Sequence, residues 1–196
     1  CNEFCSFCVI PFARGRSRSR TVESTVSQVG RLVQSGYQEV VLTGVHIGDY
    51  GMDLDVRFVD LLEAVERVQG LKRFRVSSIE ATFLTPEVID FLASTPKFCR
   101  HLHVPLQSGD DSILSAMRRP YRSAFYADLL DRLADRIPGI GIGADVMVGF
   151  PGESEAAFRN TVGLVESSPL VFLHVFPYSP RGNTPAAKLS DNVGPA

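Results

Sequence analysis

The sequence has no apolar run that approaches the ~18 residues needed to cross a bilayer, and it does not open with a signal peptide. These two absences predict a cytoplasmic protein. Internal repeats and low-complexity tracts are also missing. Hydrophobic residues make up 44% and charged residues 21% of the chain, which excludes the disordered and collagen-like classes. A length of 196 residues is enough for one sizeable domain.

Net charge is scarce as well, at −2, so the chain as a whole has no attraction for nucleic acid. The distribution of charge is more informative, because arginines far outnumber lysines and fall in two clusters: Arg14, Arg16, Arg18 and Arg20, then Arg118, Arg119 and Arg122. The guanidinium group is a planar fork that binds phosphates and carboxylates through two bonds. Each cluster taken alone fits phosphate contact and a solvated surface equally well.

Cysteine is rare, with four in the chain, and three of the four lie within the first eight residues. Cytosolic cysteines seldom form disulfides, so this cluster indicates metal or redox chemistry. Cys1, Cys5 and Cys8 form a C-x3-C-x2-C pattern, whereas Cys99 precedes an expected buried strand and reads as a small apolar residue. Three thiolates without a fourth ligand leave one metal position open, as a catalytic metal requires.

Beyond the cysteines, helical and strand patterns alternate. Five strands are expected, at 39–43, 73–77, 101–106, 142–148 and 171–178. The helices between them include one opened by Thr85 and Pro86, one over 123–136, and one marked by Phe158, Val162 and Val165. Such alternation predicts an α/β fold with a parallel sheet and right-handed crossovers.

Small or polar residues follow each expected strand, for example Thr43-Gly44 and Gln107-Ser108. In barrels of parallel strands, the functional residues gather at the carboxyl ends of the strands. We therefore expect a partial (β/α)6 TIM-like barrel rather than an open sheet. A helix follows the cysteine loop directly, so the first strand is expected to be missing and the chain to be a piece of a longer protein.

The cysteine spacing, with Phe7 before the last cysteine, resembles the cluster loop of the radical S-adenosylmethionine (SAM) superfamily. This resemblance implies a barrel of the radical SAM type and a [4Fe–4S] cluster on Cys1, Cys5 and Cys8. It further implies that the fourth iron chelates SAM. One electron from the cluster then cleaves the sulfonium and gives a 5′-deoxyadenosyl radical.

Two longer motifs, at residues 1–20 and 145–153, resemble the methylthiotransferases of that superfamily, which are transferases of alkylthio groups. Residues 42–51, 77–81 and 101–109 are most similar to the branch that inserts a methylthio group at C2 of N6-threonylcarbamoyladenosine, beside the anticodon of tRNA. That branch implies tRNA as a partner and an electron donor such as flavodoxin or ferredoxin. It also implies a second [4Fe–4S] cluster in a missing N-terminal domain.

Carried over by position, the resemblance implies a set of SAM contacts and no catalytic side chain. The contacts are Phe7, Thr43, Gly44, Ser78, Glu80, Gln107, Ser108, Arg119, Val148, Gly149 and Tyr178. The run Arg14, Arg16, Arg18 and Arg20 is expected to bind RNA phosphates. Plainer roles stay open, such as helix capping for Glu80. Asp145 lies in an apolar strand and is expected to pair with an arginine or a substrate group.

Domain boundaries follow from composition. Residues 1–180 are expected to form the radical SAM core, and 181–196 a linker towards a missing C-terminal RNA-binding domain. The isolated segment is expected to cleave SAM weakly at best.

Two alternative functions within the superfamily are methylthiolation of isopentenyl-adenosine in tRNA and of a ribosomal-protein aspartate. A third, from another class, is a zinc-binding module without catalysis.

Overall fold

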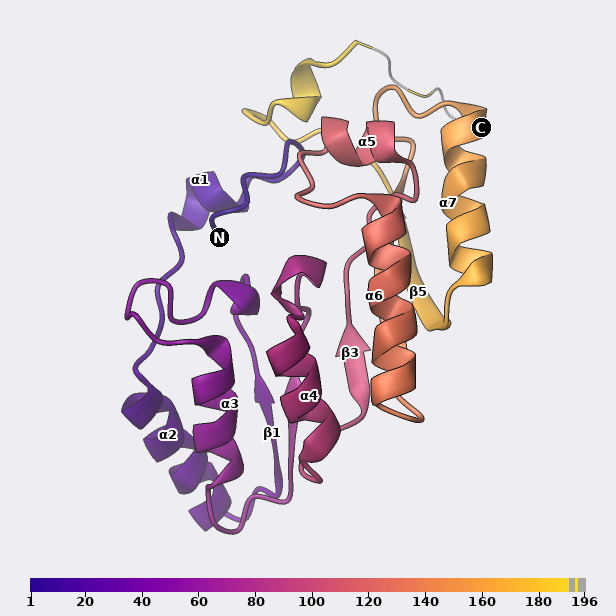
Figure 1. The fold of residues 1–196 in the computed structure, drawn as a ribbon. Helices are drawn as coiled ribbons and strands as arrows, with labels where there is room; N and C mark the ends of the chain where they lie inside the picture. Colours follow the sequence, from indigo (N-terminus) through magenta and orange to yellow (C-terminus); the bar gives the residue numbers. More distant parts are fainter. Residues whose placement is uncertain (191–192, 194–196) are drawn as a thin grey trace. The chain divides into compact units, whose positions relative to one another are not determined.

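The structure is a computed structural model that describes residues 1–190 and residue 193. Its residues group into two compact units. Unit 1 comprises Cys1–Arg16, Val104–Arg132 and Ile142–Ala196, and unit 2 comprises Ser17–His103 and Leu133–Gly141. Within the described residues, strands and helices alternate along the chain as the sequence predicts (Figure 1).

Unit 2 is built on two parallel strands, β1 (Glu39–Leu42) and β2 (Arg73–Val76), which pair in register with Val40 opposite Phe74. Phe74 also bridges Phe98 in the segment that leads to β3 (His101–His103). Helix α3 contacts the helices on either side of it (Figure 1). The three helices are α2 (Val22–Gln34), α3 (Phe58–Glu66) and α4 (Pro86–Ser94).

The helices of unit 2 begin where the sequence predicts. The Thr85 hydroxyl accepts a bond from the amide of Val88 at 3.4 Å, and Pro86 occupies the first turn, where a missing N–H costs nothing. The apolar stripe of α3 supplies core residues, among them Leu62 and Val65, which are completely buried. Burial of this stripe is the main source of helix stability here.

Unit 1 contains the parallel pair β4 (Gly141–Val148) and β5 (Leu170–Pro177), in which Asp145 lies opposite His174. Unit 1 also contains helices α1, α5 and α7. Helix α6 begins in unit 1 and ends in unit 2, and its bounds are those that the sequence predicts. These helices are α1 (Ile10–Arg14), α5 (Asp111–Ala116), α6 (Ser123–Arg136) and α7 (Glu155–Ser167). Three short 3-10 helices, η1 (Ile47–Asp49), η2 (Ala81–Phe83) and η3 (Ala186–Lys188), complete the described elements.

The expected strand over 101–106 is shorter than predicted, since β3 ends at His103. The segment after it still runs along β4, because the amides of Val104 and Leu106 donate to the carbonyls of Gly143 and Asp145. Pro105, between them, has no N–H to donate on the side of the segment that faces away from β4.

The segment predicted to be a linker starts as ordered structure. Thr184 and Ala186 are buried within unit 1, and the amide of Ala186 donates to the carbonyl of Ser6 at 2.9 Å. The boundary at residue 180 and the linker role stay predictions, and residues 191–192 and 194–196 lie outside the described part.

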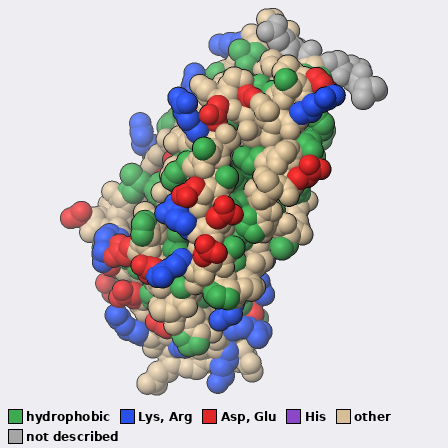
Figure 2. All heavy atoms as spheres, turned by 45° about the vertical axis from the view of Figure 1, so that its right-hand side comes forward, with side chains coloured by type: hydrophobic (Ala, Val, Ile, Leu, Met, Phe, Trp, Pro, Cys, Tyr) green, Lys and Arg blue, Asp and Glu red, His purple; other side chains and the backbone are tan. Residues whose placement is uncertain are grey.

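The surface drawn in Figure 2 has acidic and basic side chains intermixed, with apolar side chains between them, as the small net charge leads one to expect. Among the described residues, no helix combines the length and apolar character that crossing a membrane requires.

Candidate cofactor site

The cysteine loop opens unit 1 and leads into α1. All four cysteines lie in the described part of the chain and none forms a disulfide; Cys5 is buried, and Cys1 and Cys8 are half-buried. The loop turns back on itself between the last two of the three, because the amide of Cys8 donates to the carbonyl of Cys5 at 3.1 Å. Three thiols on one tight loop are the donor set that an iron–sulfur cluster takes.

Ser6 ties this loop to unit 1. Its amide donates to the carbonyl of Met117 at 3.0 Å, and its hydroxyl donates to the carbonyl of Ala116 at 2.7 Å. Its own carbonyl accepts the bond from the amide of Ala186. The sequence reasoning passed over Ser6, although a small polar residue between metal-binding cysteines is a signal of such anchoring.

Arg119 lies against the loop, with its Nη1 atom 3.2 Å from the Sγ atom of Cys5. Its Nε and Nη2 atoms donate to the hydroxyl of Tyr121, at 3.3 and 3.1 Å. The structure thus places the predicted SAM contact Arg119 beside a cluster cysteine. Tyr121 was missed by the sequence reasoning, although the Arg-x-Tyr spacing could have drawn attention to it.

Phe7 of the cysteine loop and Tyr178 pack against one cluster of buried apolar residues in unit 1. The cluster consists of Ile113, Met117, Met147, Phe150, Ala157 and Ala186. The ring of Tyr178 meets the ring of Phe150 edge-on, with centroids 5.4 Å apart. Its hydroxyl is buried without a hydrogen-bond partner in the described part of the chain, and burial raises the pKa of Tyr178. A buried unsatisfied hydroxyl fits a polar ligand that would complete it.

Val148 and Gly149 stand at the end of β4. Gly149 has a φ of +74°, and a Cβ there would meet nothing closer than 4.0 Å, so the backbone rather than crowding requires glycine. The amide of Gly149 donates to the carboxylate of Glu153 at 2.5 Å. Burial raises the pKa of Glu153, and this bond opposes the rise. The open space beside Gly149 is compatible with close approach of a cofactor.

Gln107 and Ser108 follow the segment that runs along β4. Gln107 is buried with a φ of +70°, an unusual backbone conformation for a residue with a side chain, and its Oε1 atom has no partner among the described residues. The Ser108 hydroxyl lies 3.2 Å from that of Thr161 and accepts from the amide of Asp110. Gln107 therefore offers a buried acceptor, whereas the Ser108 hydroxyl is occupied within its own loop.

The remaining predicted SAM contacts belong to unit 2. Thr43 and Gly44 directly follow β1 and are exposed. Ser78 is exposed, with its hydroxyl 2.6 Å from the Nδ1 atom of His103. Glu80 is buried and caps η2, since its carboxylate accepts from the amide of Ala81 at 3.2 Å. The capping role that the sequence left open for Glu80 is therefore present.

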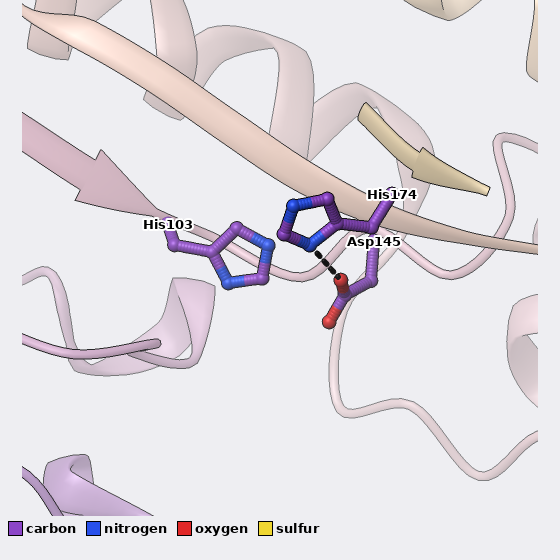
Figure 3. Close-up of side chains that lie close together, drawn as sticks. All are labelled: His103, Asp145 and His174. Carbon is purple, nitrogen blue, oxygen red and sulfur yellow. Dashed lines mark ion pairs between the residues drawn. The ribbon is translucent and has the colours of Figure 1, made fainter. Parts of the chain in front are cut away.

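Asp145 pairs with a residue that the sequence did not suggest. We expected an arginine or a substrate group, but its carboxylate lies 3.4 Å from the Nδ1 atom of His174, its register partner on β5 (Figure 3). Adjacent parallel strands bring these two positions together, and a single sequence gives no register for that pairing.

The arginine run is exposed at all four positions, Arg14, Arg16, Arg18 and Arg20. In unit 2 its residues alternate with serines that are tied down: the hydroxyl of Ser17 donates to Asp49 at 2.5 Å, and that of Ser19 accepts from the amide of Gly51 at 2.9 Å. This Ser-Arg-Ser-Arg alternation holds the serines and leaves Arg18 exposed, whereas the guanidinium group of Arg20 donates to the side chains of Gln28 and Ser24. Phosphate contact by the run stays a prediction.

A family model described as the radical SAM superfamily matches residues 1–165. The chain belongs to the radical SAM superfamily. Members of this superfamily bind a [4Fe–4S] cluster and SAM. The match covers the cysteine loop, Arg119 and Gly149, which the structure groups in unit 1.

Two curated relatives align over 98% of the chain. The threonylcarbamoyladenosine tRNA methylthiotransferase MtaB of Bacillus subtilis is 49% identical. The tRNA-2-methylthio-N(6)-dimethylallyladenosine synthase of Carboxydothermus hydrogenoformans is 40% identical. The chain spans 43% and 44% of the length of these relatives.

Solved structures confirm the fold class. The radical SAM methyltransferase TsrM of Kitasatospora setae, solved with cobalamin and a [4Fe–4S] cluster, superimposes with a TM-score of 0.80 at 21% identity, over 95% of this chain and 34% of that one. The coproporphyrinogen III oxidase HemN of Escherichia coli does so with a TM-score of 0.68 at 17% identity, over all of this chain and 46% of that one. The predicted α/β fold of the radical SAM type is therefore correct.

Proposed function

We propose that this chain is the radical SAM core of a tRNA methylthiotransferase that inserts a methylthio group at C2 of N6-threonylcarbamoyladenosine next to the anticodon. The observation that carries this proposal is the 49% identity to the Bacillus subtilis threonylcarbamoyladenosine enzyme, against 40% to the dimethylallyladenosine synthase of Carboxydothermus hydrogenoformans. Both alignments run over nearly the whole chain, so the difference is not one of coverage.

The residues of unit 1 fit the cofactors of the superfamily. Cys1, Cys5 and Cys8 would hold the [4Fe–4S] cluster, which when bound supplies the electron that cleaves SAM. Ser6 fixes the loop that carries these thiols. The buried acceptor of Gln107 and the buried hydroxyl of Tyr178 are polar atoms that a SAM molecule would satisfy.

Several further contacts stay proposals on the sequence resemblance alone. They are Phe7, Thr43, Gly44, Ser78, Glu80, Ser108, Val148 and Gly149 for SAM. The second cluster, the flavodoxin or ferredoxin donor, the cytoplasmic location and the linker role of 181–196 also stay proposals. Membership of the radical SAM superfamily leaves the zinc-binding module without support.

The modified nucleoside decides between the two tRNA candidates. We would reconstitute the full-length enzyme anaerobically, supply SAM and tRNA carrying either N6-threonylcarbamoyladenosine or isopentenyl-adenosine, and analyse the nucleosides by mass spectrometry. The proposal predicts 2-methylthio product from the first tRNA. Product from isopentenyl-adenosine alone would show that the dimethylallyladenosine relatives indicate the true branch. A methylthiolated ribosomal-protein aspartate, with no tRNA product, would favour the third candidate.

Binding of tRNA by the arginine run can be tested separately. Arg18→Ala with Arg20→Ala should weaken tRNA binding and reduce the slope of log affinity against log salt by roughly 0.7–0.9 for each phosphate that is no longer neutralised. A matched control is Arg31→Ala with Arg67→Ala, which removes the same charge from exposed positions of unit 2. An equal change in both double variants would mean that only net charge matters.

A further inference from the structure

A cationic side chain lies directly against one of the three cluster cysteines. The Nη1 atom of Arg119 is 3.2 Å from the Sγ atom of Cys5, within hydrogen-bonding distance for a sulfur acceptor. Cys5 is the most buried of the three cysteines, at 8% exposure. The interaction therefore lies in a partly dehydrated place, where a charge acts more strongly than it does in water.

Tyr121 holds the guanidinium group of Arg119 in this position. Two of its nitrogens donate to the hydroxyl of Tyr121, and its Cζ atom lies 5.2 Å from the centre of the Tyr121 ring. That hydroxyl is itself fixed, since it lies 2.8 Å from the carbonyl of Pro105 and 3.0 Å from that of Leu106. Arg119 is thus anchored through Tyr121 to the segment that runs along β4.

The backbone adds a further constraint. Arg118 has a φ of +59°, which turns the chain sharply after α5, and the amide of Arg119 donates to the carbonyl of Leu114 at 2.9 Å. A residue with a side chain adopts this region only at a cost, and such conformations concentrate at functional sites. The turn aims the side chain of Arg119 at the cysteine loop.

The geometry points to a role for Arg119 in setting the reduction potential of the cluster, with Tyr121 as its positioning residue. An N–H···S bond and a positive charge stabilise the reduced cluster more than the oxidised one, because the reduced cluster carries one more negative charge. Arg119 should therefore raise the potential. This inference rests on the proposed function only for the presence of a cluster on Cys1, Cys5 and Cys8.

This role differs from the SAM-carboxylate contact that the sequence predicts for Arg119. A contact with the SAM carboxylate changes the cluster only when SAM is bound. A hydrogen bond to Cys5 acts with or without SAM. The potential measured without SAM therefore separates the two roles.

The test is a redox titration of the full-length protein, reconstituted anaerobically without SAM and followed by electron paramagnetic resonance. The signal that survives when Cys1, Cys5 and Cys8 are all replaced by alanine is subtracted, which isolates this cluster from any other. We expect Arg119→Met to lower the reduced-to-oxidised ratio at a fixed potential about tenfold, or about 59 mV for a one-electron couple. Tyr121→Phe should lower it about threefold, since the guanidinium keeps its charge but loses its anchor.

The matched control is Arg122→Met, which removes the same charge three residues away from a side chain that is 84% exposed. Its potential should stay at the wild-type value. Iron is counted for every variant. If Arg119→Met binds no cluster, Arg119→Lys is measured in its place, because lysine keeps the positive charge but lacks the planar, forked guanidinium group.

Three results would overturn the inference. An unchanged potential in Arg119→Met without SAM, with a shift only after SAM is added, would return Arg119 to the SAM carboxylate. An equal shift in Arg122→Met would make the effect one of net charge. A wild-type protein with no iron on this loop would overturn the cluster assignment itself, which the iron count reveals before any titration.

Discussion

Units 1 and 2 both have buried polar atoms without a partner among the described residues, but these atoms lie in different surroundings. In unit 1, the hydroxyl of Tyr178 and the Oε1 atom of Gln107 are buried without a partner among the described residues, and Gln107 and Arg118 have positive φ angles. In unit 2, the Oγ atom of Ser77, directly after β2, is likewise buried without a partner among the described residues, and Asp55 has a positive φ angle. What distinguishes unit 1 is position: Tyr178 packs against the same apolar cluster as Phe7 of the cysteine loop, so its unsatisfied hydroxyl belongs beside the candidate cofactor site.

The ion pairs of unit 2 lie on its surface. The carboxylate of Glu39 binds Arg75 at 2.7 Å and Arg73 at 2.8 Å across β1 and β2, and the bond to Arg75 is the main reason that its pKa is lowered. Arg57 joins Asp60 and Glu87 in the same way. These pairs are exposed, so each contributes little to stability compared with the buried helices.

The largest expected effect comes from the core of unit 2. Leu62→Ala should lower the free energy of unfolding by about 2–5 kcal/mol, because Leu62 is completely buried and its removal leaves a cavity. Arg57→Ala, which breaks two exposed ion pairs, should cost much less than Leu62→Ala. Urea unfolding of the two variants measures the difference. Equal losses would show that surface charge stabilises this unit as much as its core does.

A smaller effect compares two glycines, one in each unit. Gly149→Ala should destabilise by roughly 1–2 kcal/mol, because its φ of +74° is unfavourable for a residue with a Cβ. Gly30→Ala, inside α2 with open space around it, should stabilise by about 0.5–1 kcal/mol. Thermal unfolding measures whether each variant is more or less stable than the wild type. A stabilised Gly149→Ala variant would mean that the loop after β4 does not need its glycine conformation.

The smallest effect concerns pH. Burial, and then the charge of Arg75, lower the pKa of His101 below its usual 6.5. The unfolded chain therefore takes up a proton at His101 more readily than the folded chain, so this contribution to stability is present above pH 6.5 and is lost as the pH falls through the folded pKa. His101→Gln should lose less stability than the wild type between pH 7 and pH 5, measured by urea unfolding. Equal losses of stability in the variant and the wild type would show that His101 does not contribute to the acid sensitivity.

Local signals in the sequence were enough for most elements of the fold. The cap at Thr85, the helix over 123–136 and the parallel alternation all appear as predicted. The face of α7 was not predictable: Phe158 is 40% exposed, whereas Ala157 and Thr161 are buried. The reason is tertiary, since a Cβ on Gly109 would lie 2.6 Å from the Cα atom of Thr161, so the helix packs closely through its small residues.

The residues of the candidate site fall into the same two groups: those that local sequence signals predict and those that depend on tertiary structure. The three cysteines and Arg119 could be named from spacing and resemblance. The pairing of Asp145 with His174 depends on strand register, and the anchoring by Ser6 and Tyr121 depends on hydrogen bonds to residues more than a dozen positions away. The spacing of Ser6 and Tyr121 could mark them as candidates, but the bonds that they make, like the strand register, depend on the tertiary structure.

The most direct test of the cluster assignment is an anaerobic iron and sulfide count on the full-length protein, followed by a SAM-cleavage assay. Replacing Cys1, Cys5 and Cys8 together by alanine should remove about four irons per chain and abolish SAM cleavage. Cys99→Ala should change neither, because Cys99 is a buried thiol whose pKa is raised by burial. Unchanged iron and SAM cleavage in the triple variant would contradict the assignment.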